Sequence, residues 1–455
     1  MLTVECIETS DLGDRSYIAH DGSTAVVVDP QRDLDRFEKV LADRGLTCAL
    51  VLETHIHNDY VTGGYELSRR TGATYAVAAA DDVSFDRQAV SDGDQLTAGR
   101  LRVRVLATPG HTDTHLAYVI AAGDDGPPAV FTGGSLLYGS VGRTDLIDPA
   151  RTDELTRAQY RSARRLADEL PDGTAVYPTH GFGSFCSSGS ASGDDSSTIG
   201  AERRSNDALT MSDEDAFVEK LVAGLTAYPA YYAHMGAVNR QGPGPIDLSP
   251  PAPVDADELR KRVSAGEWVV DLRDRTAYAA EHLAGTIGIA LGGQFSTYLG
   301  WLIPWGTPLT LIGESAEEVT EAQRQLVRIG IDRPDGAAVG RPGELANDGE
   351  LRSYPTTTFA ELTAQIQAGS VAPSDVLDVR RDDERADGKI PGSLHVPLTN
   401  LIERLADLPD RKLWVHCASG FRASIATSLL DGAGRDVVLL DDEYDKAVES
   451  GLATG

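Results

Sequence analysis

Short β-branched segments alternate with helical ones over the first 180 residues of the chain. Residues 24–28 (TAVVV) and 48–52 (CALVL) are apolar runs of strand length, and residues 33–45 (DLDRFEKVLADRG) between them carry apolar side chains at helical spacing. The glycine- and serine-rich residues 181–198 predict a loop, and the prolines that follow residue 242 predict an extended linker. We therefore expect an α/β domain that ends near residue 252.

Beyond this linker the chain repeats itself. The segment WVVDLRDRTAYAAEHLAGTIG resembles DVLDVRRDDERADGKIPGS, and the spacing from Asp271 to Gly285 equals that from Asp378 to Gly392. Each copy has a strand that ends in Asp-x-Arg, a glycine turn and a further apolar strand. The sequence thus predicts three domains, over residues 1–252, 253–352 and 353–455.

The charge of the chain excludes several classes of partner. Lys and Arg number 41 against 70 Asp and Glu, a net charge of −29 that repels nucleic acid phosphates and anionic lipids alike. We therefore expect no nucleic acid and no membrane as partner. The chain has no apolar run of about 18 residues and no signal-peptide pattern at its start, so we expect a cytoplasmic protein. Whether the chain forms a homo-oligomer stays open.

Histidines gather where strands end. Five of the ten lie in three segments that each follow an apolar run: His55 with His57, His111 with His115, and His180. Loops that leave the same ends of neighbouring strands converge, and imidazoles at such a point suit Zn, Fe or Cu. The pattern HxHxD, which ends at Asp59, also indicates a metal site. The alternative is that each histidine is a polar cap of its loop. We expect His115 to support the site or to point away from it, and not to bind the metal.

The motifs also carry a resemblance. THIHND (54–59), TPGHTDTH (108–115) and THG (179–181), with FTGGSLLYGSVGRTDL (131–146) between the last two, resemble the metallo-β-lactamase superfamily and especially its persulfide dioxygenase branch. Glyoxalase II hydrolases are the nearest relatives of that branch. The resemblance implies an αββα sandwich. It also implies two metal sites: His55, His57 and His111 for the first, and Asp59, Tyr60 and His180 for the second, with Gly134 at the bridging aspartate.

Two of these positions depart from the pattern. Tyr60 replaces a histidine, and a phenol with a pKa of about 10 is a poor metal ligand, which disfavours a two-metal hydrolase. Persulfide dioxygenases need one iron, but Gly134 lacks the carboxylate of the usual two-histidine, one-carboxylate set. We predict one divalent metal, with Fe(II) favoured and Zn(II) possible, bound by His55, His57 and His111.

Other residues of this domain have open roles. Asp59 and His180 are either further ligands or supports of the metal site. Arg143 either guides an anionic persulfide or forms a surface ion pair. Cys186 is either a persulfide-carrying thiol near the metal or a small buried residue. An empty or purely structural metal site is the alternative to metal binding.

A second chemical motif lies near the C-terminus. In HCASGFRAS, Cys417 follows the apolar run KLWV and precedes a glycine turn and a helix, so backbone N–H groups around Ser419 and Gly420 can hold an anion. Arg422 adds a positive charge. The motif resembles the rhodanese loop CxxGxR, and the DVR and GKIPGS segments match other signatures of that family. The resemblance implies that Cys417 carries a persulfide, with Arg422 also catalytic and Ser419 and Gly420 binding substrate.

The first copy of the repeat has no cysteine near its corresponding segment TPLTLIGESAEE. It therefore predicts a degenerate rhodanese-like module. The whole order resembles fusions of a persulfide dioxygenase with rhodanese, which implies oxidation of a low-molecular-weight thiol persulfide to sulfite and sulfur transfer to or from thiosulfate. The alternatives are a glyoxalase II-like hydrolase, and a degenerate metal domain that scaffolds an active sulfurtransferase.

Overall fold

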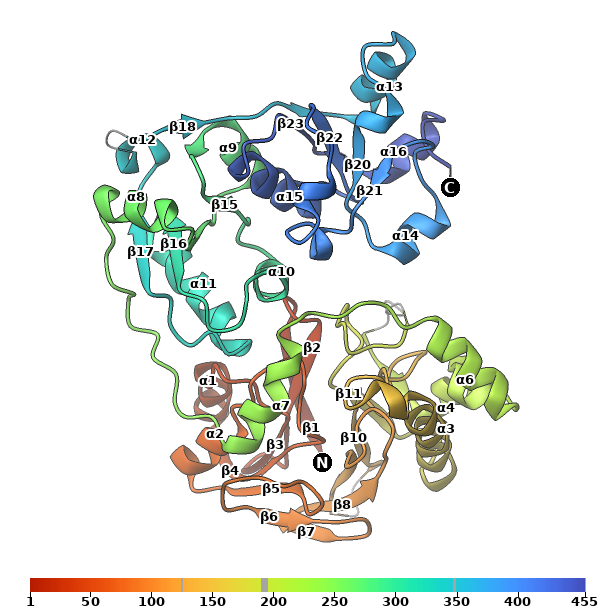
Figure 1. The fold of residues 1–455 in the computed structure, drawn as a ribbon. Coiled ribbons are helices and arrows are strands. Elements are labelled where there is room, and N and C mark those ends of the chain that lie inside the picture. Colours follow the sequence, from red (N-terminus) through yellow and green to blue (C-terminus); the bar gives the residue numbers. More distant parts are fainter. Residues whose placement is uncertain (124–125, 190–194, 347–348, 455) are drawn as a thin grey trace. The chain divides into compact units, whose positions relative to one another are not determined.

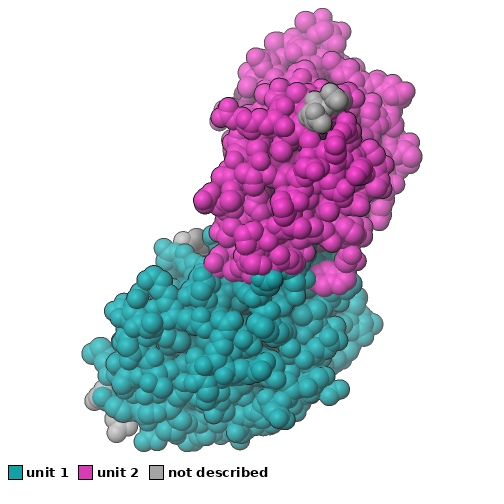
Figure 2. Space-filling model, turned by 90° about the vertical axis from the view of Figure 1, so that its left-hand side faces the viewer, with its two compact units in different colours: residues 1–247, 325–332 teal, residues 248–324, 333–455 magenta. Residues whose placement is uncertain are grey.

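The computed structural model describes residues 1–123, 126–189, 195–346 and 349–454, so residues 190–194 of the predicted loop lie outside the described part. The chain forms two compact units. Unit 1 comprises residues 1–247 and 325–332, and unit 2 comprises residues 248–324 and 333–455; Figure 2 colours them separately. The domain boundaries predicted from the sequence, at residues 252 and 352, stay predictions.

Unit 1 contains two six-stranded sheets (Figure 1). The first sheet has the order β1 (Thr3–Thr9), β2 (Asp14–His20), β3 (Thr24–Val28), β4 (Thr47–Leu52), β5 (Thr74–Ala78), β6 (Gln88–Val90). The second has the order β12 (Ser197–Thr198), β11 (Ala175–Pro178), β10 (Ala129–Gly133), β9 (Leu116–Ala122), β8 (Leu101–Ala107), β7 (Gln95–Ala98).

Apolar side chains at alternate strand positions form the core between these sheets. The core combines residues of both sheets: Val26, Val28, Leu50 and Leu52 from the first, and Leu101, Val103, Val105 and Phe131 from the second. Helices cover the outer faces: α1 (Asp35–Arg44) and α2 (Gly64–Thr71) on the first sheet, α3 (Thr152–Glu169), α4 (Ile199–Ser205) and α6 (Glu214–Ala223) on the second. The helices α5 (Asp207–Thr210) and α7 (Tyr232–Gln241) also belong to this unit. The predicted αββα sandwich is confirmed.

Unit 2 contains two parallel sheets with the same strand order. One runs β15 (Ile287–Gly288), β13 (Trp268–Asp271), β16 (Leu309–Gly313), β17 (Gly336–Val339). The other runs β21 (Leu394–His395), β20 (Val376–Asp378), β22 (Leu413–His416), β23 (Val437–Leu440), with β19 (Thr356–Thr357) added at its edge. The sequence repeat is therefore a structural repeat, since the Asp-x-Arg strand, β13 or β20, holds the same place in each sheet.

Helices pack around both sheets of unit 2. They are α8 (Ala256–Ser264), α9 (Arg275–Ala280), α10 (Phe295–Leu302) and α12 (Pro342–Leu345) in the first copy, and α13 (Phe359–Gln367), α14 (Asp382–Asp387), α15 (Phe421–Gly432) and α16 (Tyr444–Glu449) in the second. The helix α11 (Ala316–Arg328) follows β16, and β14 (His282–Leu283) pairs with β18 (Leu351–Arg352). No helix among the described residues is long and apolar enough to cross a membrane.

The Asp-x-Arg motif forms the same buried ion pair in both copies. The Nη2 atom of Arg273 lies 2.7 Å from an oxygen of Asp271, and Nη2 of Arg380 lies 2.9 Å from an oxygen of Asp378. In the second copy Arg380 also donates to the carbonyl oxygen of Gly388, which ties the strand to the glycine turn that follows. Burial by itself raises the pKa of Asp378, but His416 and Arg380 lower it to about 2. The pair thus holds an ionised carboxylate in the core.

Replacement of Arg380 by Met is expected to destabilise the second copy by about 3 kcal/mol, because the buried carboxylate of Asp378 loses its main partner. Hydrogen exchange of peptides from β20 and β22, measured by mass spectrometry, would show the loss as faster exchange. The neighbouring Arg381 pairs with Asp383 at a partly exposed position, so Arg381→Met is the matched control and should change exchange little. Equal effects of the two substitutions would contradict the prediction.

Candidate metal centre and sulfur-transfer loop

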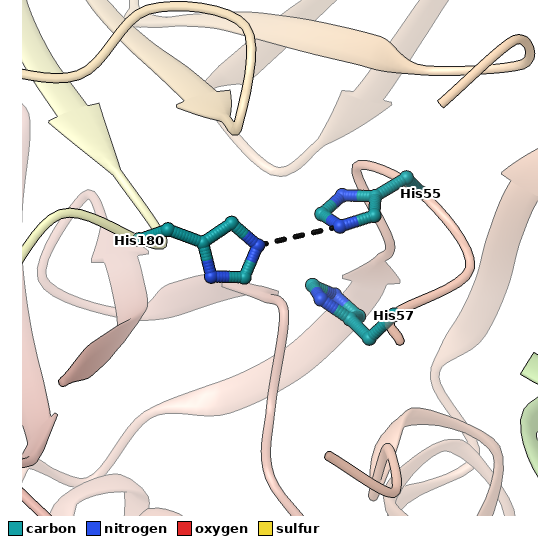
Figure 3. A group of neighbouring side chains, drawn as sticks. All are labelled: His55, His57 and His180. Carbon is teal, nitrogen blue, oxygen red and sulfur yellow. Dashed lines mark hydrogen bonds between the residues drawn. The ribbon is translucent and has the colours of Figure 1, made fainter. Parts of the chain in front are cut away.

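Four buried histidines converge where strands of unit 1 end. His55 and His57 follow β4, His111 follows β8, and His180 follows β11; each has at most 1% of its surface exposed. The ring centres of His55 and His57 are 4.1 Å apart, and those of His55 and His111 are 4.8 Å apart. Figure 3 shows His55, His57 and His180 facing one another, with 3.3 Å between the Nε2 atoms of His55 and His180. The convergence predicted from the sequence is present.

The carboxylate of Asp29 connects the loops that carry these histidines. Asp29 follows β3, is fully buried, and has a positive φ of 50°, a conformation that is uncommon for a residue with a side chain. Its oxygens accept hydrogen bonds from the backbone N–H and the hydroxyl of Thr54, and from the hydroxyl of Thr179. Because Thr54 precedes His55 and Thr179 precedes His180, Asp29 fixes both metal-binding loops at once.

The second ring nitrogens of His55 and His57 are held from outside the centre. Nδ1 of His55 lies 2.9 Å from the hydroxyl oxygen of Thr54. Nε2 of His57 lies 3.3 Å from a carboxylate oxygen of Glu53 and 3.4 Å from one of Asp29. Burial lowers the pKa of both rings, but the two carboxylates outweigh burial for His57 and raise its pKa to about 9. These contacts leave Nε2 of His55 and Nδ1 of His57 directed at the centre.

The outer ring nitrogens of His111 and His180 also have partners in the protein. Nδ1 of His111 lies 2.7 Å from the carbonyl oxygen of Arg143, and Nδ1 of His180 lies 2.9 Å from a carboxylate oxygen of Asp14. Burial, reinforced by His180, lowers the pKa of His111 to about 3, whereas Asp59 and Asp14 overcome burial and raise the pKa of His180 to about 10. A carboxylate or carbonyl on the outer nitrogen is the usual support of a metal-binding imidazole.

The inner nitrogens fit a divalent metal. Nδ1 of His57 and Nε2 of His111 are buried without a hydrogen-bond partner, and a buried ring nitrogen without a partner requires an explanation. Ligand atoms of three residues lie within 4.8 Å of one another in several groups: His55 with His57 and His180, His111 with His180 and Cys186, and Asp14 with Asp59 and His180. A fourth such group combines His57 with Asp29 and Glu53, so His180 belongs to three of the four groups. It therefore lies more centrally than the sequence indicated.

A second candidate site lies at Cys417 in unit 2. Cys417 directly follows β22, is 1% exposed, and is separated from the start of α15 by a turn in which Gly420 has a φ of 89°. The first backbone N–H groups of a helix have no partner within the helix, so they are available to an anion at the sulfur. Arg422 forms two hydrogen bonds to the carboxylate of Glu384, of 2.5 and 2.7 Å. Its charge is thus balanced within the protein.

The first copy of the repeat contacts this loop. Arg275 donates to the carbonyl oxygen of Ser419 and pairs with Asp441, at 3.3 and 2.6 Å. The ring of Tyr298 lies edge-on to that of Phe421, which begins α15. Within unit 2, the module without a cysteine therefore helps to shape the surroundings of Cys417.

Comparisons with known proteins match the two parts of the chain that carry these candidate sites. Residues 14–180 match the model of the metallo-beta-lactamase superfamily, and residues 358–449 match that of the rhodanese-like domain. The N-terminal domain of the chain belongs to the metallo-β-lactamase superfamily. The chain also carries a C-terminal rhodanese-like domain, as the motif around Cys417 predicted.

The relatives are named for different activities. The chain is 28% identical over 251 residues to persulfide dioxygenase ETHE1, mitochondrial, of Homo sapiens, which covers 55% of this chain and 84% of that protein. It is 36% identical to a hydroxyacylglutathione hydrolase of Prochlorococcus marinus, over 35% of this chain and 60% of that one. A crystal structure of a metallo-beta-lactamase from Staphylococcus aureus matches with a TM-score of 0.66 and 27% identity, over 74% of this chain and 99% of that one.

In this metallo-β-lactamase domain the ring of His111 fills the space at Gly134. A Cβ atom added to Gly134 would lie 2.4 Å from Cδ2 and 2.5 Å from Cγ of His111. The backbone N–H of Gly134 donates to Nε2 of His115, and Nδ1 of His115 lies 3.0 Å from the hydroxyl of Thr108. Both ring nitrogens of His115 thus have partners within the protein, and its supporting role stays a prediction. A carboxylate at residue 134 would require His111 to move.

Tyr60 supports His57. The two rings stack with their centres 4.2 Å apart, and the hydroxyl of Tyr60 lies 3.0 Å from Nε2 of His57 and donates to the carbonyl oxygen of Asp29. Burial, with Asp29 and Glu53 nearby, raises the pKa of Tyr60 well above its usual value, so the phenol stays neutral. Tyr60 therefore adds no negative charge to the metallo-β-lactamase site.

Arg143 is buried and fully engaged. Its guanidinium pairs with both oxygens of Asp145 and donates to the carbonyl oxygens of Phe185 and Thr226. These contacts place it as a clamp on the loop after His180, and the predicted guidance of an anionic substrate by Arg143 stays a prediction.

Sequence reasoning did not select the acidic residues that hold the outer nitrogens, Asp14, Asp29 and Glu53, nor Glu384 at the rhodanese loop. Asp14 and Asp29 are far from the histidine motifs in sequence. Their signal was weak because an isolated Asp beside a predicted strand is common on any α/β surface.

Replacement of Gly134 by Ala is expected to lower the affinity for a divalent metal by about 10- to 100-fold, because the methyl group displaces His111. Competition with a chelator, followed by metal analysis of the protein, would measure the change. Gly173→Ala is the matched control, since a Cβ at Gly173 meets nothing within 4 Å. An unchanged affinity of the Gly134→Ala variant would contradict the placement of His111.

Proposed function

We propose that the chain is a bifunctional enzyme of sulfur metabolism. Its metallo-β-lactamase domain oxidises the terminal sulfur of a low-molecular-weight thiol persulfide to sulfite, and its rhodanese domain transfers sulfane sulfur between sulfite, thiosulfate and a thiol. The observation that carries the proposal is a set of buried imidazoles in the same chain as Cys417. Their outer nitrogens have partners in the protein, whereas the inner nitrogens Nδ1 of His57 and Nε2 of His111 have no hydrogen-bond partner. The likeness to a persulfide dioxygenase supports the sulfur substrate.

The residues of unit 1 have different proposed roles at the metal centre. His55, His57 and His111 are the proposed ligands, with His180 as a further ligand or support, and a redox-active divalent metal such as Fe(II) supplies the activation of dioxygen when bound. In the overall reaction one persulfide, one O2 and one water give one thiol, one sulfite and two protons. Asp29 keeps the loops of His55 and His180 in place, so the ligand geometry does not depend on the substrate.

At the second site Cys417 is the proposed nucleophile. Its thiolate attacks the outer sulfur of thiosulfate, the bond between the two sulfurs of thiosulfate breaks, and sulfite leaves with the electron pair of that bond. The Cys417 persulfide then passes its outer sulfur to an acceptor thiolate. In the opposite direction sulfite accepts this sulfur and forms thiosulfate. Arg422 balances the negative charge at the loop, in competition with Glu384.

A glyoxalase II-like hydrolase is the second candidate, because the chain is 36% identical to a hydroxyacylglutathione hydrolase over 166 residues. Tyr60 and Gly134 count against it, since they remove two ligands of a second metal. Cytoplasmic location stays a prediction from the sequence.

Oxygen uptake tests the first activity. The full chain loaded with Fe(II) is expected to consume about one O2 per glutathione persulfide and to release sulfite, with about one iron per chain, as the written reaction requires. Metal analysis, an oxygen electrode and sulfite determination give the three values. Bound zinc with no uptake by iron-loaded protein would contradict the proposal, and two bound metals with thioester hydrolysis would favour the hydrolase.

Replacement of Cys417 by Ser is expected to reduce sulfur transfer from thiosulfate to cyanide by more than about 10³-fold, because serine cannot form the persulfide. Thiocyanate formation measures the transfer. Cys6→Ser, at the exposed thiol in β1, is the control and should leave the rate unchanged. Retained activity in the Cys417→Ser protein would show that another group, such as Cys186, carries the sulfur.

A further inference from the structure

The thiol of Cys186 lies at the metal centre. Its side chain is fully buried, and its sulfur lies within 4.8 Å of ring nitrogens of His111 and His180. Nε2 of His111 is buried without a hydrogen-bond partner. The remaining buried thiol of unit 1, Cys48, belongs instead to an apolar cluster with Ile18 and Phe37. Cys186 thus has the surroundings of a ligand, whereas Cys48 has those of a core residue.

The loop around Cys186 is held in place by residues that follow Gly134. The backbone N–H of Arg143 donates to the carbonyl oxygen of Cys186 at 2.9 Å, and the side chain of Arg143 donates to the carbonyl oxygen of Phe185 at 3.0 Å. Gly142 and Ser187 form a β-bridge. The segment after Gly134, where the superfamily pattern has an aspartate, therefore positions the thiol of Cys186.

A thiolate would add a negative charge among neutral imidazoles, beside the buried carboxylate of Asp59, which lies near His180. Histidines bind a metal as neutral groups, Tyr60 is a phenol, and residue 134 is a glycine without a side chain. A thiolate is a strong anionic ligand for Zn(II) and Fe(II), and it forms when the metal displaces the thiol proton to solvent. A thiol at this place restores one negative charge to the ligand set.

We propose that Cys186 binds the metal of unit 1 through its sulfur, together with His111 and His180, and supplies the negative charge that the glycine at position 134 does not. The proposal rests on metal binding by unit 1, as proposed above, but not on the oxidation of a persulfide. This set shares His111 with the three histidines that the sequence predicted, and it adds His180 and a thiolate.

Cobalt(II) tests the bond directly, because a cobalt thiolate absorbs strongly in the near ultraviolet through sulfur-to-metal charge transfer and a site of nitrogen and oxygen ligands does not. The full chain with Cys417→Ser, which removes the rhodanese thiol, is loaded with one Co(II) and its spectrum recorded. The same protein with Cys186→Ser added should lose the charge-transfer band, and the protein with Cys48→Ser added should keep it. A Co(II)-loaded parent without this band, or an unchanged band after Cys186→Ser, would overturn the proposal.

X-ray absorption of the Zn(II)-loaded Cys417→Ser protein serves as a second measurement that does not depend on folding of the Cys186 variant. One sulfur at about 2.3 Å from zinc is expected, and a shell of nitrogen and oxygen alone would overturn the proposal. Oxygen uptake by iron-loaded protein without metal–sulfur signals would leave the proposed function standing and refute the ligand. The signals without uptake would support the ligand and refute the oxygenase.

Discussion

The carboxylate of Asp29 is the interaction on which the metal centre depends. It is fully buried at the end of β3, in a backbone conformation with positive φ, and it accepts hydrogen bonds from Thr54 and Thr179. A buried charge is tolerated only where donors surround it, and here the donors belong to the two loops that carry His55 and His180. The same hydrogen bonds therefore stabilise this carboxylate and fix the geometry of the ligands. Neither loop can shift without leaving the charge of Asp29 unpaired.

The centre departs from its superfamily in charge more than in shape. The imidazoles keep the arrangement that the sandwich imposes, and Asp14, Glu53 and Asp29 keep their outer nitrogens occupied. At Gly134, however, the His111 ring takes the volume of the missing side chain, and at Tyr60 a neutral phenol packs on His57. The first change removes a negative charge from the inside of the site, the second puts a neutral phenol in place of a neutral imidazole, and both preserve packing. This loss of charge supports the proposal of a single metal, since each further cation needs anionic ligands to offset its burial.

The two copies of the repeat in unit 2 share a scaffold but differ in their candidate active residues. Both copies keep the Asp-x-Arg pair and the strand order, because these features stabilise the sheet irrespective of activity. Only the second copy has a cysteine at the end of the central strand, and the first copy contributes Arg275 and Tyr298 to its surroundings. The loss of the cysteine from one module thus leaves its packing role intact.

Much of this protein follows from local sequence. Strand and helix periodicity gives the α/β layers, the equal spacing of the two Asp-x-Arg segments gives the repeat, and the HxHxD and CxxGxR motifs locate both sites, because each of these signals lies within a few neighbouring residues. The sequence could not show which nitrogen of each histidine faces inward, that Arg422 is paired with Glu384, or that Cys186 lies beside His111 and His180. Those facts depend on residues far apart in the chain, such as Asp14 with His180. The packing of the two sheets of unit 1 brings Asp14 to His180, and the fold of the second copy in unit 2 brings Glu384 to Arg422.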